Sequence, residues 1–248
     1  MGALIEICVE GPDGALAAQE GGANRVELCS SLAEGGVTPS WGSIELVRAL
    51  LSIDLAILIR PRSGDFLYSK AEFEAMKLDI RRAREAGAHG VVLGILRENG
   101  AIDIDRTAEL IEAARPLSVT FHRGFDLCRD PREGLHDLIR LGADRVLTSG
   151  HAPSAAEGLA LIREMVDEAR DRISIMPGGG VNEENIRSIV DGTRAREVHL
   201  SASAFVESPT RREIGRPQLG RGGPTGENQR RITDLEKVRR CVAALRNP

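Results

Sequence analysis

The chain has 248 residues, of which 42% are hydrophobic and only 3% aromatic, so a sizeable core must consist mainly of Leu, Ile, Val and Ala. Its 33 basic and 37 acidic residues give a net charge of −4, which argues against a nucleic-acid-binding or membrane-surface protein. No run approaches the roughly 20 apolar residues of a membrane span, the first ten residues lack the basic segment of a signal peptide, and four cysteines do not make a disulfide scaffold, so we expect a cytoplasmic protein with free thiols.

Eight short apolar runs predict eight β-strands. Each run is nearly continuous in apolar residues, as is typical of parallel strands that are covered on both faces. The runs are Ala3–Val9, Arg25–Cys29, Leu55–Arg60, Gly90–Leu93, Leu117–Arg123, Asp144–Ser149, Ile173–Pro177 and Glu197–Ser201.

Helical segments lie between these runs. The segment 69–86 begins with a capping serine and has apolar residues at helical spacing, and Pro131 stands at a first helical position. The other predicted helices span residues 12–20, 39–51, 104–114, 154–169, 182–190 and 233–245. Strand and helix thus alternate eight times, which favours an α/β fold with a single-domain (β/α)8 TIM barrel over residues 1–248, with an open doubly wound sheet as the alternative.

One region departs from this alternation. Residues 208–231, after the eighth predicted strand, contain three prolines, several glycines and several arginines. We interpret this segment as an irregular, solvated loop. The functional alternative is a lid that brings Arg211 or Arg212 onto a bound anion.

Ionisable residues stand near the C-terminal ends of the apolar runs, which is the end where a TIM barrel carries its active site. Because side chains alternate along a strand, Glu6 shares a face with Cys8, and Glu27 shares a face with Cys29. His199 lies on the eighth run. Buried charges are expensive unless they line a polar site, so the pattern predicts a polar pocket inside the barrel.

The structural alternative is that these charges only neutralise one another. Glu6 or Glu27 would then pair with Arg25 or Arg60 inside the barrel. Such pairing is compatible with a functional pocket.

The densest group of polar residues lies in the segment 120–126. His122 is expected to face the barrel, with Arg123 and Asp126 on the loop that follows. Histidine transfers protons near neutral pH, and a nearby carboxylate can fix its tautomer. The candidate catalytic residues are therefore Glu6, Glu27, Arg60, His122, Arg123, Asp126 and His199.

A second group predicts an anion site. Arg60 and Arg62 flank a rigid turn, and arginine side chains suit carboxylates and phosphates. Gly178, Gly179 and Gly180 follow the seventh strand and lead into a helix, and Ser201 ends the eighth strand. Backbone amides at this place match the usual phosphate position of TIM barrels, although a triple glycine can also be only a tight turn.

Cys8 and Cys29 complete the same-face sets on the first two strands. Two thiolates suit a monovalent copper ion. The alternative is that both cysteines pack as small hydrophobic residues in the barrel wall.

The motifs together resemble the copper homeostasis protein CutC family along nearly the whole chain. The matching segments are Glu6–Cys8, Gly22–Cys29, Glu34–Ser40, Ile59–Tyr68, Val119–Asp126, Leu147–Gly150 and Met176–Val181. The resemblance implies a cytosolic (β/α)8 barrel that is often a homo-oligomer. It also implies that copper, as Cu(I), binds to Cys8 and Cys29.

Two hypotheses for the function follow. The first is a copper-binding protein of copper homeostasis, as the resemblance implies. The second is a TIM-barrel enzyme that acts by proton transfer on a small phosphate- or carboxylate-bearing metabolite. A Schiff-base mechanism is disfavoured, because no lysine lies on a predicted strand. A metal centre of two histidines and two glutamates is also disfavoured, because the neighbouring arginines would repel a cation.

Overall fold

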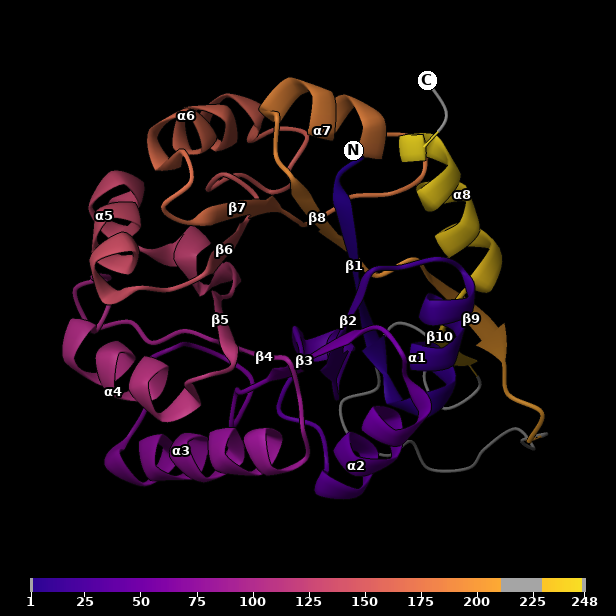
Figure 1. The fold of residues 1–248 in the computed structure, drawn as a ribbon, viewed down its shortest axis with the longest axis horizontal. Coiled ribbons are helices and arrows are strands. Elements are labelled where there is room, and N and C mark those ends of the chain that lie inside the picture. The colour runs from indigo at the N-terminus through magenta and orange to yellow at the C-terminus, as the bar shows by residue number, and fades with distance from the viewer. Residues whose placement is uncertain (1, 211–228, 247–248) are drawn as a thin grey trace, which may run out of the picture.

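Eight parallel strands form a barrel inside a ring of helices in the computed structural model, which describes residues 2–210 and 229–246 (Figure 1). The hydrogen-bonded order of the strands is β7-β6-β5-β4-β3-β2-β1-β8, and β7 lies beside β8, so that the ring is nearly closed. The strands are β1 (Leu4–Glu10), β2 (Arg25–Cys29), β3 (Asp54–Leu58), β4 (Gly90–Leu93), β5 (Ser118–Phe121), β6 (Arg145–Thr148), β7 (Ser174–Pro177) and β8 (Glu197–Leu200). The prediction of a single (β/α)8 barrel is confirmed.

The helices cover the outside of the barrel. The helices predicted at 69–86 and from Pro131 begin where their capping residues predict, whereas the helix predicted at 182–190 begins at Ile186. Ser69 and Glu72 form a capping box at the start of α3, and the Asp130 side chain accepts hydrogen bonds from the first turn of α5. The helices are α1 (Gly11–Glu20), α2 (Trp41–Leu50), α3 (Lys70–Glu85), α4 (Ile104–Ala114), α5 (Pro131–Leu141), α6 (Leu159–Ala169), α7 (Ile186–Thr193) and α8 (Leu235–Arg246). Among the described residues, none of the helices combines the length and the apolar character that crossing a membrane requires.

Helix α6 begins at Leu159, five residues later than its predicted start at Ser154. The intervening residues form turns in which the Ser154 hydroxyl accepts a hydrogen bond from the Glu157 amide. Gly158 then packs directly against the backbone of Ser149, at the end of β6. This close approach fixes the loop after β6 at the C-terminal mouth of the barrel.

A hairpin that the sequence did not predict follows β8. It pairs β9 (Ser203–Glu207) with β10 (Gln229–Thr233) in antiparallel register. Residues 229–231, which we expected in the irregular loop 208–231, therefore belong to a strand. Arg211 and Arg212, which we considered as lid residues, lie outside the described residues.

The hydrophobic core lies between the sheet and the helices, whereas part of the barrel interior is polar. The core packs aliphatic strand residues such as Ile7, Leu55 and Ile57 against helix residues such as Met76 and Ile80, all with essentially no exposure. The buried charged residues Glu6, Arg25, Glu27 and His199 come from strands β1, β2 and β8. The outer faces of the strands therefore form the stabilising core, and the inner faces of β1, β2 and β8 carry the charged residues.

The packing of Gly158 yields a test of this loop anchor. A Cβ atom at Gly158 would lie 1.9 Å from the Ser149 carbonyl oxygen. We expect Gly158→Ala to lower the free energy of unfolding by about 1–3 kcal/mol, the usual cost of overpacking. Urea denaturation of the purified protein measures this change.

Gly42, inside α2, provides the matched control. A Cβ atom there would meet nothing within 4 Å, so Gly42→Ala should raise the free energy of unfolding by about 0.5–1 kcal/mol. Equal effects of the two substitutions would contradict this account of the loop.

Candidate functional site

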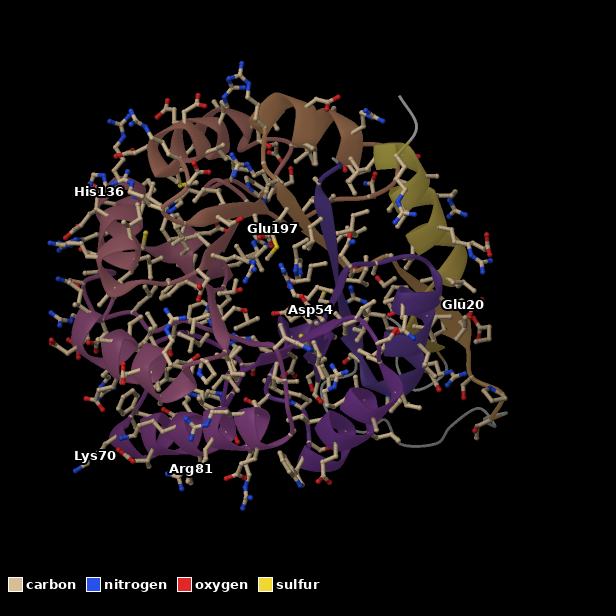
Figure 2. The ribbon with its side chains drawn as sticks, in the orientation of Figure 1. Glu20, Asp54, Lys70, Arg81, His136 and Glu197 are labelled. Carbon is tan, nitrogen blue, oxygen red and sulfur yellow. The ribbon has the colours of Figure 1, made fainter. Side chains whose placement is uncertain are left out.

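A chain of buried and half-buried ion pairs runs through the barrel interior. Glu197 on β8 accepts hydrogen bonds from Arg145 Nε at 2.6 Å and from Arg25 Nη2 at 2.5 Å. Arg25 also donates through Nε to Glu6. The second oxygen of Glu6 lies 2.8 Å from His199 Nδ1. Figure 2 shows Glu197 within the ring of strands. This chain of ion pairs therefore lies inside the barrel and ends at the imidazole of His199.

The ion pairs keep Glu6 and Arg25 in their charged forms. Burial alone would raise the pKa of Glu6, but Arg25 and His199 outweigh burial and lower this pKa to about 2. Burial alone would lower the pKa of Arg25, yet Glu6 and Glu197 raise it. The pairing of Glu6 with Arg25, which the sequence offered as the structural alternative, is therefore present.

Three potential metal ligands meet where this chain ends. A ligand atom from each of Cys8, Glu27 and His199 lies within 4.8 Å of the other two, and all three residues are buried. Cys8 is the register partner of Glu27 between β1 and β2, and His199 Nε2 lies 3.7 Å from a Glu27 oxygen. Because Nδ1 of His199 is occupied by Glu6, Nε2 is the nitrogen that faces the other two groups.

The surroundings raise the pKa values of Glu27 and His199 in this cluster. Burial, with a smaller contribution from Glu6, raises the pKa of Glu27 to about 7, although His199 opposes the shift. Burial alone would lower the pKa of His199, but Cys8, Glu6 and Glu27 raise it above its usual value. A proton and a metal ion would therefore compete for the same atoms.

Cys29 lies next to this cluster but is not part of it. Its thiol is buried and lies 3.9 Å from the Glu27 carbonyl oxygen. Burial and the charge of Glu27 raise its pKa well above the usual range. Cys8 and Cys29 also belong to a small apolar cluster with Ala56, Leu58 and Val92. The structure thus brings Cys8 closest to Glu27 and His199, with Cys29 as a neighbour on the same wall.

A pocket of about 320 Å³ opens above the cluster, at the C-terminal ends of the strands. Its apolar side includes Cys8, Cys29, Leu58 and Phe66. Its polar side includes residues from the loops after β5, β7 and β8, namely Arg123, Gly179, Gly180, Ser201 and, from the hairpin, Arg231. Gly178, the first residue of the triple glycine, packs against His199 and Leu147 below the pocket. The position is the one expected for a TIM-barrel active site.

His122 forms part of the pocket wall and is nearly unexposed. It lies just past the end of β5, where its Nδ1 accepts a hydrogen bond from the Gly124 amide at 3.1 Å. Its Nε2 is buried and has no hydrogen-bond partner among the described residues. Burial and the charge of Arg60 lower the pKa of His122 to about 3. The ring is therefore neutral near pH 7, with its proton on Nε2.

The two arginines of the predicted anion site lie in different places. Arg60 lines the pocket, but its guanidinium donates to the backbone carbonyls of Glu34, Gly36 and Gly64 at 2.7–3.1 Å. Arg62 is not a pocket residue and pairs with acidic side chains on the surface. Of the two arginines, only Arg60 lines the same pocket as Gly179 and Gly180.

Asp126 holds the loops at the mouth and does not line the pocket. Its carboxylate accepts hydrogen bonds from the Ser149 amide at 3.0 Å, from the Ser149 hydroxyl at 2.9 Å and from the Thr148 hydroxyl. It also receives Arg123 Nε at 2.8 Å. Asp126 therefore contacts Arg123, which lines the pocket, but does not line the pocket itself.

Two residues near the site did not stand out in the sequence. Arg145 is the first residue in the chain of ion pairs. The sequence signal for it was a charged residue at the start of a strand, followed by apolar residues. Arg231 reaches the pocket from β10. Its position could not be read from the sequence, because it depends on a hairpin between segments more than 20 residues apart.

Comparisons with known proteins place this barrel in a family. A profile of the CutC family matches residues 3–204. The human copper homeostasis protein cutC homolog is 44% identical over 246 residues, covering 99% of this chain and 90% of the human protein. A CutC family protein from Parabacteroides distasonis is 48% identical over 240 residues, covering 96% and 99% of the two chains. The chain belongs to the CutC family.

Solved structures agree with this assignment. A crystal structure of CutC from Streptococcus agalactiae has a TM-score of 0.76 at 36% identity and covers 79% of this chain and 97% of its own. The phosphoribosyl anthranilate isomerase of Thermotoga maritima has a TM-score of 0.61 at 16% identity over 99% and 100% of the two chains, which shows a shared fold alone. The resemblance to the CutC family that the sequence motifs indicated is confirmed.

Removal of Arg25 tests the buried ionic chain. Arg25→Met would leave Glu6 and Glu197 without this cation inside the barrel. We expect the free energy of unfolding to fall by roughly 3–5 kcal/mol, the cost of breaking a buried pair from one side. Arg196→Met is the matched control, because its ion pair with Asp171 is largely exposed and should contribute roughly 0–1 kcal/mol. Similar losses in both variants, measured by chemical denaturation, would count against the buried chain.

The environment of His122 predicts a pH dependence. Its pKa is about 3 in the folded protein, against 6.5 for an unperturbed histidine, so below pH 6.5 the unfolded chain binds a proton that the folded chain does not. This contribution to stability is present above pH 6.5 and is lost as the pH falls toward 3. We expect wild type to lose about 2 kcal/mol more stability than His122→Gln between pH 7 and pH 5. An identical pH dependence of the two unfolding free energies would show that the ring titrates normally.

Proposed function

We propose that this chain binds a copper ion at the wall of the barrel pocket and acts in copper homeostasis. The observation that carries the proposal is the convergence of Cys8, Glu27 and His199 within 4.8 Å of one another, inside a pocket that opens at the barrel mouth. The relatives named for copper homeostasis, at 44% and 45% identity in human and mouse, support the same role.

The donor types favour monovalent copper as the cargo. Thiolate and imidazole are the ligands that suit copper, and thiolates select Cu(I). Cys8 and His199 would supply one of each, with Cys29 as the neighbouring second thiol. Glu27 is a harder oxygen donor whose pKa of about 7 leaves it largely protonated below neutral pH, so it would contribute less to Cu(I) than the sulfur atoms.

Binding also has to displace protons from this site. The raised pKa of His199 and the strongly raised pKa of Cys29 mean that copper must replace a proton when it binds either of these two residues. All four cysteines are free and buried, which supports a role in the reducing environment of the cytosol.

Replacement of the cysteines tests this proposal. We expect Cys8→Ser to weaken Cu(I) binding by at least about 10-fold, because a hydroxyl is a poor substitute for a thiolate and even supporting groups of a metal site cost 10–100-fold. Cys29→Ser should also weaken binding, and Glu27→Gln should have the smallest effect of the three. An anaerobic competition titration against a chromophoric Cu(I) chelator measures each affinity.

Cys241→Ser is the matched control, because Cys241 is a free, buried cysteine on α8 that does not line the pocket. Its Cu(I) affinity should equal that of wild type. Equal affinities for Cys8→Ser and Cys241→Ser would refute a copper site in the barrel.

A further inference from the structure

The pocket is larger than a metal site needs. Its volume of about 320 Å³ lies at the lower end of small-molecule sites, and the three clustered donors occupy one part of its wall. The loops after β5 and β7 present a cationic side chain and glycine backbone instead of thiols. Strand β10, which packs against β1 and α1, brings a second cationic side chain to the pocket.

Arg123 is fixed in place with part of its guanidinium unused. Its Nε donates to Asp126 at 2.8 Å and its Nη2 donates to Ser149 at 2.7 Å. Its Nη1 has no hydrogen bond among the described residues and lies beside Gly179, where a Cβ atom would come within 3.0 Å of it. A preoriented guanidinium of this kind loses little entropy when it binds an anion.

Arg231 adds a second positive charge to the pocket from β10, which packs against β1 and α1. It lies on β10 and lines the pocket, and within the described ranges 2–210 and 229–246 no acidic side chain pairs with it. Among the described residues, the acidic residue that lines the pocket is Glu27, which comes from β2. Arg231 therefore has no acidic partner in the described part of the chain, and Arg123, although paired with Asp126, keeps its Nη1 available to a ligand.

The turn at Gly179 and Gly180 is held through its carbonyl groups. The Gly179 carbonyl accepts the Ala155 amide at 2.9 Å, and the Gly180 carbonyl accepts Asn185 Nδ2 at 2.9 Å. Neither glycine amide donates a hydrogen bond within the described part of the chain. Both residues line the pocket and have positive φ angles, 97° and 72°, which suit glycine. Successive free amides in such a turn form an anion-binding nest.

His122 provides the independent sign of a ligand. The residue is 6% exposed, and the Nδ1–Cε1 edge of its ring packs against Gly94 and Gly124. The remaining edge carries Nε2, a buried donor without a partner among the described residues, in a side chain that lines the pocket. A buried donor without a partner costs free energy, and a ligand oxygen would remove that cost.

We propose that this pocket binds a small phosphate ester, with its phosphate against Arg123, Arg231 and the amides of the glycine turn, and with a second oxygen accepting the His122 Nε2 proton. Phosphate is favoured over carboxylate because several donors converge from different directions, which suits its three oxygens. The neutral ring of His122 suits a carbonyl or hydroxyl oxygen better than a charged one. None of these contacts uses Cys8, Glu27 or His199, so the proposal does not rest on copper binding.

Calorimetric titration of the full-length, chelator-treated protein tests the proposal with four probes. Glycerol 3-phosphate should bind saturably, inorganic phosphate more weakly, and glycerol not at all. Glycerate, which carries a carboxylate, should bind more weakly than glycerol 3-phosphate. Tighter binding of glycerate would overturn the phosphate assignment, and no saturable binding of either phosphate probe would overturn the site.

Arginine variants locate the phosphate. Arg123→Gln and, on a different element, Arg231→Gln should each weaken glycerol 3-phosphate binding about 10-fold or more. Arg132→Gln is the matched control, because Arg132 is an exposed residue of α5 that pairs with Glu164 away from the pocket. Its affinity should stay within about twofold of wild type. Equal weakening by the control and the pocket variants would overturn the assignment, and thermal unfolding verifies that each variant is folded.

Histidine variants locate the second oxygen. His122→Leu should make the affinity for glycerol 3-phosphate equal to that for inorganic phosphate. His122→Gln, which keeps a donor near the Nε2 position, should retain part of the higher affinity for glycerol 3-phosphate. An unchanged difference between the two affinities in His122→Leu would overturn the role of His122. Cu(I) titration of the same variants should match wild type, which separates failure of this site from failure of the copper site.

Discussion

The buried chain from Arg145 to His199 is the constraint on which the site depends. Each ion removed from water costs several kcal/mol, so the barrel interior tolerates these charges only because each carboxylate is shared by two cations. Glu197 lies between Arg145 and Arg25, and Glu6 lies between Arg25 and His199. The chain therefore fixes the ring of His199, because Nδ1 is committed to Glu6 and only Nε2 can face the pocket.

This constraint divides the pocket into two chemically different sides. On the side of β1 to β4, Cys8 and Cys29 lie among apolar residues such as Ala56, Leu58 and Val92. The loops after β5 and β7 carry Arg123 and glycine amides that donate to no partner among the described residues, and β10 adds Arg231 to the pocket. A soft metal ion and a hard oxyanion suit opposite sides, since the first needs thiolates and the second needs hydrogen-bond donors and positive charge. The proposed copper ion and phosphate ester could therefore occupy one pocket without sharing ligands.

Much of the fold was predictable because buried parallel strands leave a strong pattern. The eight apolar runs matched all eight strands to within a few residues, and alternation along β1 and β2 correctly placed Glu6 with Cys8 and Glu27 with Cys29. The exceptions were local. Helix α6 starts late because Gly158 packs on another loop, and β9 and β10 pair across a segment whose composition indicates no regular structure.

The sequence by itself determined which residues face the inside of the barrel, because the strand period of two leaves no other choice once the outer face is apolar. Only the tertiary structure decided which of them meet. Arg60 and Arg62 stand two residues apart, yet one lines the pocket and donates to loop carbonyls while the other pairs with surface carboxylates. The partners of a long arginine side chain depend on which groups lie near it in the folded protein, and not on its position in the sequence. The same reason explains why Cys8 has Glu27 as its register partner on β2 and meets His199 from β8, since strand stagger, and not residue type, sets the neighbours.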